Sequence, residues 1–448
     1  MVSTMVDVSS NITDHISIPA RLADAASALA REERKPLLAR KRFQLGSTIF
    51  VGVLVPLLVR WPANTVSLEV IHDPWHLNTA TAAALAIALG FMIVRQFLAY
   101  PGAKATSYIL PGFAVSFGVV SLVFLLGRVD YSRYILVTSF VLSILWLHLV
   151  YFLNYRHALP KLALVPGGDD RGVTQMHDGA RWVFLDTPAK SLTGIEAVVA
   201  DLRAEHRPDW ERFIAQCVLA GIPVYDVRNV HESLTGRVEV RHLSENSFGS
   251  VLPSNLYMQI KRLLDLLMST IFLLPVCLLI GVMAVFIKLE SKGPAFFVQP
   301  RMGYRGRTFR MFKLRSMRTD MPPGQYFTSE DDPRITRIGR FIRKYRIDEL
   351  PQIFNIIRGD MSWIGPRPEA VQLGEWYAKD IPFYVYRHAV RPGISGWAQV
   401  NQGNVAEVEA ATVKLQFDFY YIKNFSPWLD LLIVLKTIRT VLTGFGSV

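Results

Sequence analysis

Four long apolar runs in the first third of the sequence constrain this chain more than any other feature. They cover residues 44–62, 80–99, 107–127 and 134–154. Each is close to the ~20 residues that a helix needs to cross the hydrocarbon core of a bilayer. In a chain of 448 residues, 51% of them hydrophobic, such runs predict a four-helix transmembrane region (44–154) joined to soluble parts.

Positive charge is distributed unevenly between the two ends of these runs. The connection 63–79 contains no Lys or Arg, and the next turn on that side contains only Arg128 and Arg133 around Asp130. The opposite ends carry Arg40, Lys41, Arg42, Arg95, Lys104, Arg156 and Lys161. The positive-inside rule therefore places both ends of the four-helix region in the cytoplasm.

Residues 1–43 are polar and charged, and the first apolar run begins only after them. A secretory signal keeps its basic residues within a short N-terminal region, so we expect a cytoplasmic tail here instead of a cleaved signal. We expect the four helices to act as a plain anchor. Lipid access and homodimer formation are the alternatives.

Residues 155–250 have the pattern of a soluble α/β domain. Strands are expected at 162–165, 182–185 and 223–227, and helices at 194–204 and 209–220. The intervals suit a Rossmann-like fold, but a dinucleotide site needs a G-x-G-x-x-G turn, and only Gly167-Gly168 is available. We therefore expect a structural or regulatory role for this insert.

A fifth apolar run, from Leu263 to Ile287, is long enough to span a bilayer but is interrupted by Pro275. Basic residues flank both of its ends, with Lys261 before it and Lys288 after it. Charge of the same sign at both ends argues against crossing. The sequence favours a re-entrant helix (256–290), broken at Pro275, that enters and leaves the same leaflet.

Arginines recur every third residue from position 334, and this run ends in the adjacent carboxylates Asp348 and Glu349. The spacing roughly follows one side of a helix and would align guanidinium groups along a polyanion. Cations leading into a carboxylate pair indicate phosphate chemistry, in which one carboxylate attacks phosphorus and the other holds a divalent metal. A solvated amphipathic helix with an ion-paired end is the alternative.

Several motifs between about Lys261 and the C-terminus together resemble the bacterial sugar transferases. This family is also called the monotopic phosphoglycosyl transferases or polyprenyl-phosphate hexose-1-phosphate transferases. The motifs are Arg334-Ile-Thr-Arg-Ile-Gly-Arg-Phe-Ile-Arg-Lys344, Asp348-Glu-Leu-Pro-Gln352, Gly359-Asp-Met-Ser362 and Gly365-Pro-Arg-Pro368. The layout of the whole chain also resembles the large members, which carry four membrane helices and a soluble insert before the catalytic part.

The resemblance implies a fold and an activity. The expected fold is an α-helical membrane bundle of four spans, a soluble α/β Rossmann-like insert, and an α/β monotopic catalytic domain (251–448) with a re-entrant membrane helix. The implied enzyme moves a hexose-1-phosphate from a UDP-sugar, with glucose or galactose favoured, to undecaprenyl phosphate and releases UMP. This would be the initiating step of exopolysaccharide, capsule or O-antigen synthesis on the cytoplasmic face of the bacterial inner membrane.

The resemblance also assigns roles within the carboxylate pair. Asp348 is implied to be the nucleophile that forms a covalent aspartyl-phosphosugar, and Glu349 is implied to be the ligand of Mg²⁺. Contacts to substrate phosphate are expected from Lys313, Arg315, Arg343 and Arg367. The implied sugar-nucleotide region contains Arg391, Gln399 and Asn401, and Pro275 is the implied break of the re-entrant helix.

Two positions depart from the family pattern Pro-Gly-Ile-Thr-Gly-Trp-Ala-Gln-Val-Asn-Gly. Ser395 replaces Thr and keeps the hydroxyl, whereas Gln402 replaces the final Gly and changes the backbone freedom near the presumed sugar pocket. The identity of the donor sugar therefore stays open.

Other function classes fit the sequence less well. A net charge of +12 is compatible with a membrane-anchored basic adaptor for anionic lipid or nucleic acid, but an adaptor needs neither carboxylate of the pair. We expect no nucleic-acid partner. Cys217 and Cys277 are the two cysteines of the sequence, which gives no disulfide framework and no cysteine-based zinc site.

Overall fold

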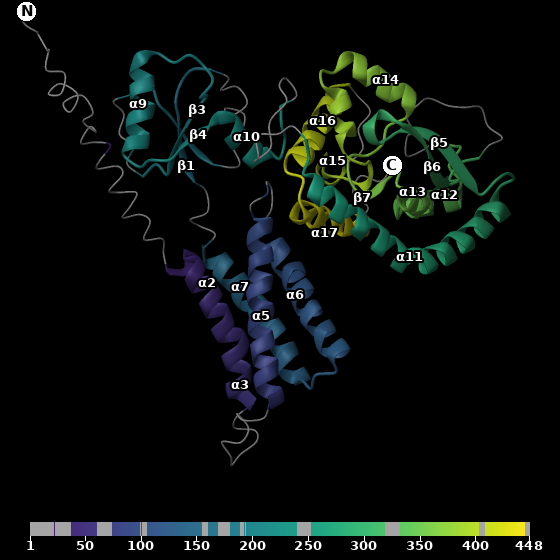
Figure 1. The fold of residues 1–448 in the computed structure, drawn as a ribbon, viewed down its shortest axis with the longest axis horizontal. Helices are drawn as coiled ribbons and strands as arrows, with labels where there is room; N and C mark the ends of the chain where they lie inside the picture. The colour runs from purple at the N-terminus through teal and green to yellow at the C-terminus, as the bar shows by residue number, and fades with distance from the viewer. Residues whose placement is uncertain are drawn as a thin grey trace, which may run out of the picture. The chain divides into compact units, whose positions relative to one another are not determined.

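The computed structural model describes residues 22, 37–60, 74–98, 100, 105–154, 160–168, 180–188, 192, 194–239, 252–318, 332–402 and 408–443 (Figure 1). Most of the expected N-terminal tail lies outside these described residues, as do residues 63–73 of the expected outward connection. The chain divides into two compact units, Met1–Thr235 and Gly236–Val448, each with its own hydrophobic clusters.

Helices cover the four N-terminal apolar runs of the first unit. They are η1 (Leu37–Ala39), α2 (Lys41–Ile49), the π-helical turn η2 (Phe50–Leu54), α3 (Val55–Arg60), α5 (Pro74–Phe97), α6 (Ala105–Gly127) and α7 (Arg133–Asn154). Among the described residues, five helices are long and apolar enough to cross a membrane, four of them here. The π turn comes just before Pro56, whose ring would clash with the carbonyl of Gly52 in a regular α-helix.

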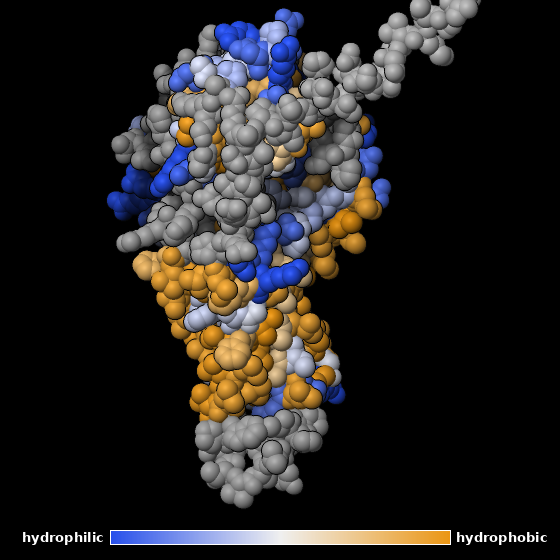
Figure 2. All heavy atoms as spheres, turned by 90° about the vertical axis from the view of Figure 1, so that its left-hand side faces the viewer, coloured by the Kyte–Doolittle hydropathy of each residue, from blue (hydrophilic) through white to orange (hydrophobic). Residues whose placement is uncertain are grey.

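The helices of this bundle pack through small residues and keep an apolar exterior. A Cβ atom on Gly52, in η2, would lie 2.5 Å from Ser143 Oγ, so only glycine permits this close approach of η2 to α7. Hydrophobic side chains also cover much of the outer face of the bundle (Figure 2), and Phe152, for example, is 75% exposed. Small residues at helix contacts and apolar residues outside are typical of helices surrounded by lipid.

A four-stranded parallel sheet follows in the same unit. Its strands β1 (Lys161–Leu164), β2 (Arg181–Phe184), β3 (Ala197–Ala200) and β4 (Val224–Asp226) are ordered β2-β1-β3-β4, with helices α9 (Pro208–Leu219) and α10 (Val227–Thr235). The strands expected at 162–165, 182–185 and 223–227 and the helix expected at 209–220 are confirmed within one or two residues. The helix expected at 194–204 is wrong, because the segment contains β3. Ala197-Val-Val-Ala200 is buried throughout, as a central strand of a parallel sheet must be.

The second unit combines helices with two small sheets. Strands β5 (Phe296–Met302) and β6 (Thr308–Leu314) form an antiparallel hairpin around η5 (Tyr304–Gly306), and β7 (Ser362–Ile364) pairs in parallel with β8 (Gly393–Ser395). The helices are α11 (Asn255–Glu290), α12 (Arg337–Lys344), η6 (Ile347–Gln352), α13 (Ile353–Arg358), α14 (Val371–Asp380), η7 (Tyr384–Ala389), α15 (Trp397–Gln402), α16 (Val408–Lys423) and α17 (Pro427–Thr443).

Helix α11 contains the fifth apolar run and stays helical through Pro275, with a bend along its length that Figure 1 shows. Its first half is fixed by Lys261, whose Nζ lies 2.5 Å from Asp430 Oδ2. Its second half buries Ile280 and Ile287 against the rest of the unit. The middle is apolar and exposed, with Leu274 at 71%. Both ends of α11 therefore pack on the same unit, while much of its centre stays exposed.

Candidate active site

The carboxylates Asp348 and Glu349 lie on η6, directly after α12. The Thr336 side chain caps α12 by accepting a hydrogen bond from Gly339 N, and α12 ends at Lys344. Arg346 then adopts a left-handed conformation with φ of 54°, which costs a non-glycine residue on the order of 1–3 kcal/mol. This turn precedes the two carboxylates, which are 9% and 4% exposed. Strain of this kind is typical of functional sites.

Two cations hold the carboxylate pair. Lys313 Nζ, from β6, lies 3.1 Å from Glu349 Oε1 and 3.8 Å from Asp348 Oδ2. Arg367, from the turn after β7, donates to the same Glu349 Oε1 at 2.6 Å. Lys313 and Arg367, for which the sequence analysis expects contacts to substrate phosphate, therefore both lie beside the pair.

The pKa values of the two carboxyl groups move in opposite directions. Burial raises the pKa of Asp348, and the neighbouring Glu349 charge adds to the rise, although Lys313 opposes it. Burial would also raise the pKa of Glu349, but the charges of Arg367, Lys313 and Arg346 outweigh burial and hold this pKa well below its usual range. Glu349 therefore stays ionised to lower pH than Asp348.

The asparagine that follows the pair fixes the position of η6 and α13 on the hairpin. Asn355 Oδ1 accepts from Phe312 N at 3.1 Å, and Asn355 Nδ2 donates to the Arg310 carbonyl at 2.7 Å. The side chain is fully buried. It therefore joins the backbone next to Lys313 to the segment that carries both carboxylates.

Of the other predicted phosphate contacts, Arg343 lies at the site and Arg315 lies elsewhere. Arg343 is half-buried near the end of α12, and its charge lowers the pKa of Asp348. The Arg315 guanidinium is buried at the end of α11, where it donates to the Ser291 carbonyl at 2.8 Å and to the Lys292 carbonyl at 2.9 Å. Arg315 therefore holds the C-terminal end of α11 against β6.

The residues predicted for the sugar-nucleotide region have other contacts. Arg391 Nε donates to the Gly359 carbonyl at 3.1 Å. Asn401 accepts from Lys436 Nζ at 2.7 Å, and Gln399 donates to the Ile394 carbonyl. Among the described residues, no hydrogen bond or ion pair joins Arg391, Gln399 or Asn401 to the carboxylate pair.

A buried layer of charges behind Arg367 was missed by the sequence analysis. Arg387 donates to the Arg367 carbonyl at 2.9 Å and to Asp418 Oδ2 at 2.7 Å, and it also lies near Glu369. Lys414 also forms an ion pair with Glu369. Single charged residues within aromatic stretches, such as Arg387 after Tyr384-Val-Tyr386 and Asp418 between Phe417 and Phe419, were the available signal. These contacts position the backbone of Arg367.

The residues of the pair fit a divalent cation that is shared with a substrate. Glu349 Oε2 is buried and has no hydrogen-bond partner among the described residues. The described residues contain no cluster of three or more metal-binding side chains. Mg²⁺ commonly takes one or two carboxylates and completes its shell with water and substrate phosphate. Glu349 Oε2 is therefore a suitable ligand.

Comparisons with known proteins show which proteins this chain is similar to. Residues 256–444 match the family described as bacterial sugar transferase. The chain is 46% identical over 415 residues to the UDP-N-acetylgalactosamine-undecaprenyl-phosphate N-acetylgalactosaminephosphotransferase of Aeromonas hydrophila. The aligned residues make up 91% of this chain and 97% of that protein.

Two further relatives match over shorter stretches. The undecaprenyl-phosphate glucose phosphotransferase of Komagataeibacter xylinus is 46% identical over 186 residues, 40% of this chain and 35% of that protein. The UDP-glucose:undecaprenyl-phosphate glucose-1-phosphate transferase of Escherichia coli K12 is 39% identical over 183 residues, 40% of this chain and 39% of that protein.

Proposed function

Because this chain belongs to the bacterial sugar transferase family, we propose that it transfers a sugar-1-phosphate from a UDP-sugar to undecaprenyl phosphate and releases UMP. The observation that carries this proposal is the buried pair Asp348 and Glu349, held by Lys313 and Arg367 within the matched residues. The names of the relatives describe undecaprenyl-phosphate sugar phosphotransferases. The product would start the assembly of an exopolysaccharide, a capsule or an O-antigen.

We propose UDP-N-acetylgalactosamine as the donor, ahead of the UDP-glucose or UDP-galactose expected from the sequence. The support is the relative from Aeromonas hydrophila, which matches 91% of this chain and is named for that sugar. The relatives named for glucose that are cited above match 40% of it. A panel of UDP-sugars decides between these donors.

In the proposed first step, a carboxylate oxygen of Asp348 attacks the phosphorus that bears the sugar. A bond forms between this oxygen and phosphorus, the bond from phosphorus to the UMP oxygen breaks, and UMP leaves with the electron pair. In the second step, an oxygen of the lipid phosphate attacks the same phosphorus and Asp348 leaves as a free carboxylate. An ionised Asp needs no general base for this attack.

The cations around the pair have separate tasks in this scheme. Lys313, Arg343 and Arg367 lie where they can neutralise the phosphate charge that approaches Asp348. Glu349 would hold Mg²⁺ through Oε2, and the ion would offset the repulsion between the Asp348 carboxylate and the diphosphate. Arg387 keeps Arg367 in place by donating a hydrogen bond to the backbone carbonyl of Arg367.

We also propose that α11 enters and leaves the same leaflet and that the other four apolar helices span the bilayer, with the catalytic unit in the cytoplasm. A straight helix of 36 residues would be about 54 Å long, so its ends would lie on opposite sides of a membrane. The two halves of α11 instead pack against the same charged unit, through Lys261 and Ile287, which supports a re-entrant path.

The test omits the lipid acceptor. Wild type in detergent, given the UDP-sugar and Mg²⁺, should release at most one equivalent of UMP and gain the mass of a phosphosugar. Asp348→Asn should do neither, while Asp380→Asn on the exposed end of α14 should behave as wild type. If wild type releases no UMP until polyprenyl phosphate is added, the covalent route is wrong. If it releases none with any UDP-sugar and acceptor, the basic adaptor becomes the better hypothesis.

A further inference from the structure

A groove lies between the β5–β6 hairpin and the η6–α13 segment, and one of its lining residues, Pro351, belongs to the helix that carries the carboxylate pair. We propose that this groove binds the first isoprenoid units of the polyprenyl phosphate acceptor. This inference rests on the proposed function and adds to it the place where the lipid chain lies.

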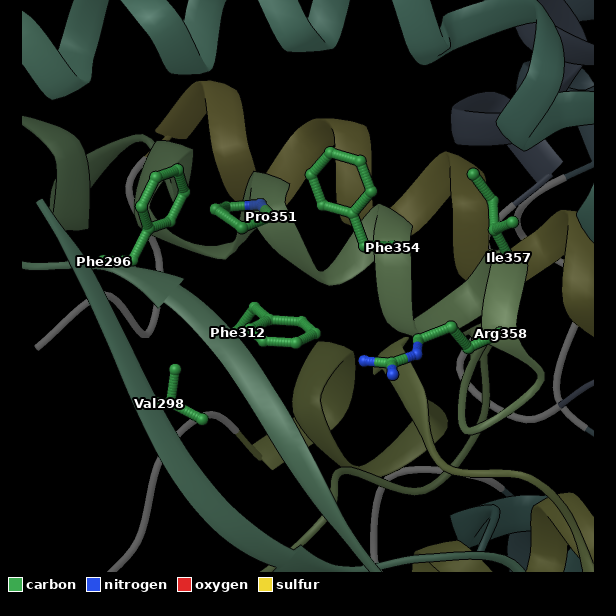
Figure 3. Close-up of a pocket in the computed structure, with 7 residues that line it drawn as sticks. All are labelled: Phe296, Val298, Phe312, Pro351, Phe354, Ile357 and Arg358. Atoms are coloured by element: carbon green, nitrogen blue, oxygen red, sulfur yellow. The ribbon is translucent and has the colours of Figure 1, made fainter.

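The groove has a volume of about 490 Å³ and an almost wholly apolar lining (Figure 3). Its lining residues are Phe296, Val298, Phe312, Pro351, Phe354, Ile357 and Arg358. Phe296, Val298 and Phe354 are 43%, 45% and 37% exposed. Exposed aromatic side chains gathered in one groove mark a binding surface more often than they mark plain surface.

Hydrogen bonds from one side chain, Asn355, fix the distance between the two walls of the groove. Asn355 lies between Phe354 and Ile357 in sequence, yet its side chain points into the unit and bonds to the backbone of β6 at Phe312 and Arg310. The position of α13 relative to the hairpin is therefore fixed. The aromatic side chains stay exposed and do not close on one another.

The lining selects a hydrocarbon occupant. A sugar or nucleotide would require several hydrogen-bonding side chains, whereas six of the seven lining residues are apolar. The exception is Arg358, whose guanidinium carbon lies 5.8 Å from the centre of the Phe312 ring. It lies at the opposite end of the groove from Phe296 (Figure 3).

The location selects the acceptor lipid among hydrocarbons. Pro351 belongs to η6, the same short helix that carries Asp348 and Glu349. The groove also has α11 at both ends: Arg262 donates to the Ile357 carbonyl, and Ala295, next to Phe296, packs against Ile280. A chain lying in the groove would therefore lie between the membrane helix and the short helix that carries the reacting carboxylate.

The test compares acceptors that share a phosphate and differ in chain length. Wild type in detergent should prefer a four-unit polyprenyl phosphate over a one-unit phosphate in kcat/KM. In Phe354→Ala this preference should fall about tenfold, because part of an aromatic contact with the chain is lost. UMP release without acceptor should be unchanged in this variant. Trp376→Ala, a 44% exposed aromatic residue on α14, is the matched control and should keep the full preference.

A second measurement locates the chain directly. A polyprenyl phosphate that carries a diazirine on its second unit should label residues 296–298 or 354–358 in wild type. Labelling elsewhere, an equal loss for both acceptors, or an unchanged preference in Phe354→Ala would overturn the inference. Variants that only weaken vesicle binding would assign the groove to bilayer contact instead. If no UDP-sugar releases UMP, the proposed function fails, while the labelling still reports on the groove.

Discussion

Arg367 donates to Glu349 Oε1 at 2.6 Å and leaves Glu349 Oε2 buried without a partner among the described residues. Lys313 adds its charge to the same Oε1 and lies farther from Asp348. Two adjacent carboxylates therefore receive unequal shares of positive charge. Pairs of acidic groups whose pKa values are pushed apart in this way take different roles in catalysis.

The first prediction is that the two members of the pair affect stability in opposite directions. The pKa of Glu349 is lowered, so its charge stabilises the fold above the ordinary Glu pKa of ~4.3, and this contribution is lost as pH falls toward the lowered value. The pKa of Asp348 is raised, so its contribution is present below the ordinary Asp pKa of ~3.9 and is lost as pH rises through the raised value.

At pH 7, Glu349→Gln should therefore lower the free energy of unfolding by about 3 kcal/mol, because Arg367 loses its buried partner. Asp348→Asn should raise the melting temperature although it abolishes UMP release. Thermal unfolding in detergent measures both variants against Asp380→Asn, whose side chain is exposed. A lower melting temperature for Asp348→Asn would show that the Asp348 carboxylate supports the fold.

The second prediction concerns pH. The nucleophile must be ionised, so UMP release without acceptor should increase as pH rises through the raised pKa of Asp348. Lys313 opposes that rise, so Lys313→Met should move the acidic limb of the profile to higher pH, besides lowering its plateau. Arg340→Met, on the exposed face of α12, should leave the limb in place. A limb that does not move in Lys313→Met would mean that another group titrates.

The third prediction separates two arginines that the sequence analysis grouped together. Arg315→Met should reduce stability by about 1–3 kcal/mol, because the buried carbonyls of Ser291 and Lys292 lose a donor. Its KM for the UDP-sugar should stay the same. Arg343→Met should leave stability nearly unchanged and raise that KM about tenfold, or ~1.4 kcal/mol. Thermal unfolding and initial rates on both variants check the pair, and a raised KM in Arg315→Met would restore a phosphate contact to it.

The difference between Arg315 and Arg343 shows where sequence reasoning stops. The run of arginines drew attention to Asp348 and Glu349, and the family resemblance pointed to Lys313 and Arg315 alike. Neither the charge pattern nor the resemblance could show that Arg315 bonds to the backbone at the end of α11, since this contact depends on how β6 meets a helix that ends more than twenty residues earlier.

The fold was predictable in the same measure. The apolar runs were found from their length, and three of the four strands of the parallel sheet from their apolar pattern. The strand Ala197-Val-Val-Ala200 was not, because four apolar residues fit a buried helix and a buried strand equally well until the sheet around them is known. The left-handed conformation of Arg346 could not be predicted either, since arginine has no preference for a positive φ.

The last prediction concerns the path of α11 in the membrane. With Cys217 and Cys277 replaced by serine, single cysteines at positions 258 and 292 lie near the two ends of α11. If both ends face the cytoplasm, a thiol reagent that cannot cross membranes should label neither site in intact cells and both sites after lysis. Asp130→Cys, in the turn between α6 and α7, is the control that should be labelled from outside. Because a spanning helix must expose one of its ends, labelling of either 258 or 292 in intact cells would contradict the re-entrant path, provided that Asp130→Cys reacts in the same preparation.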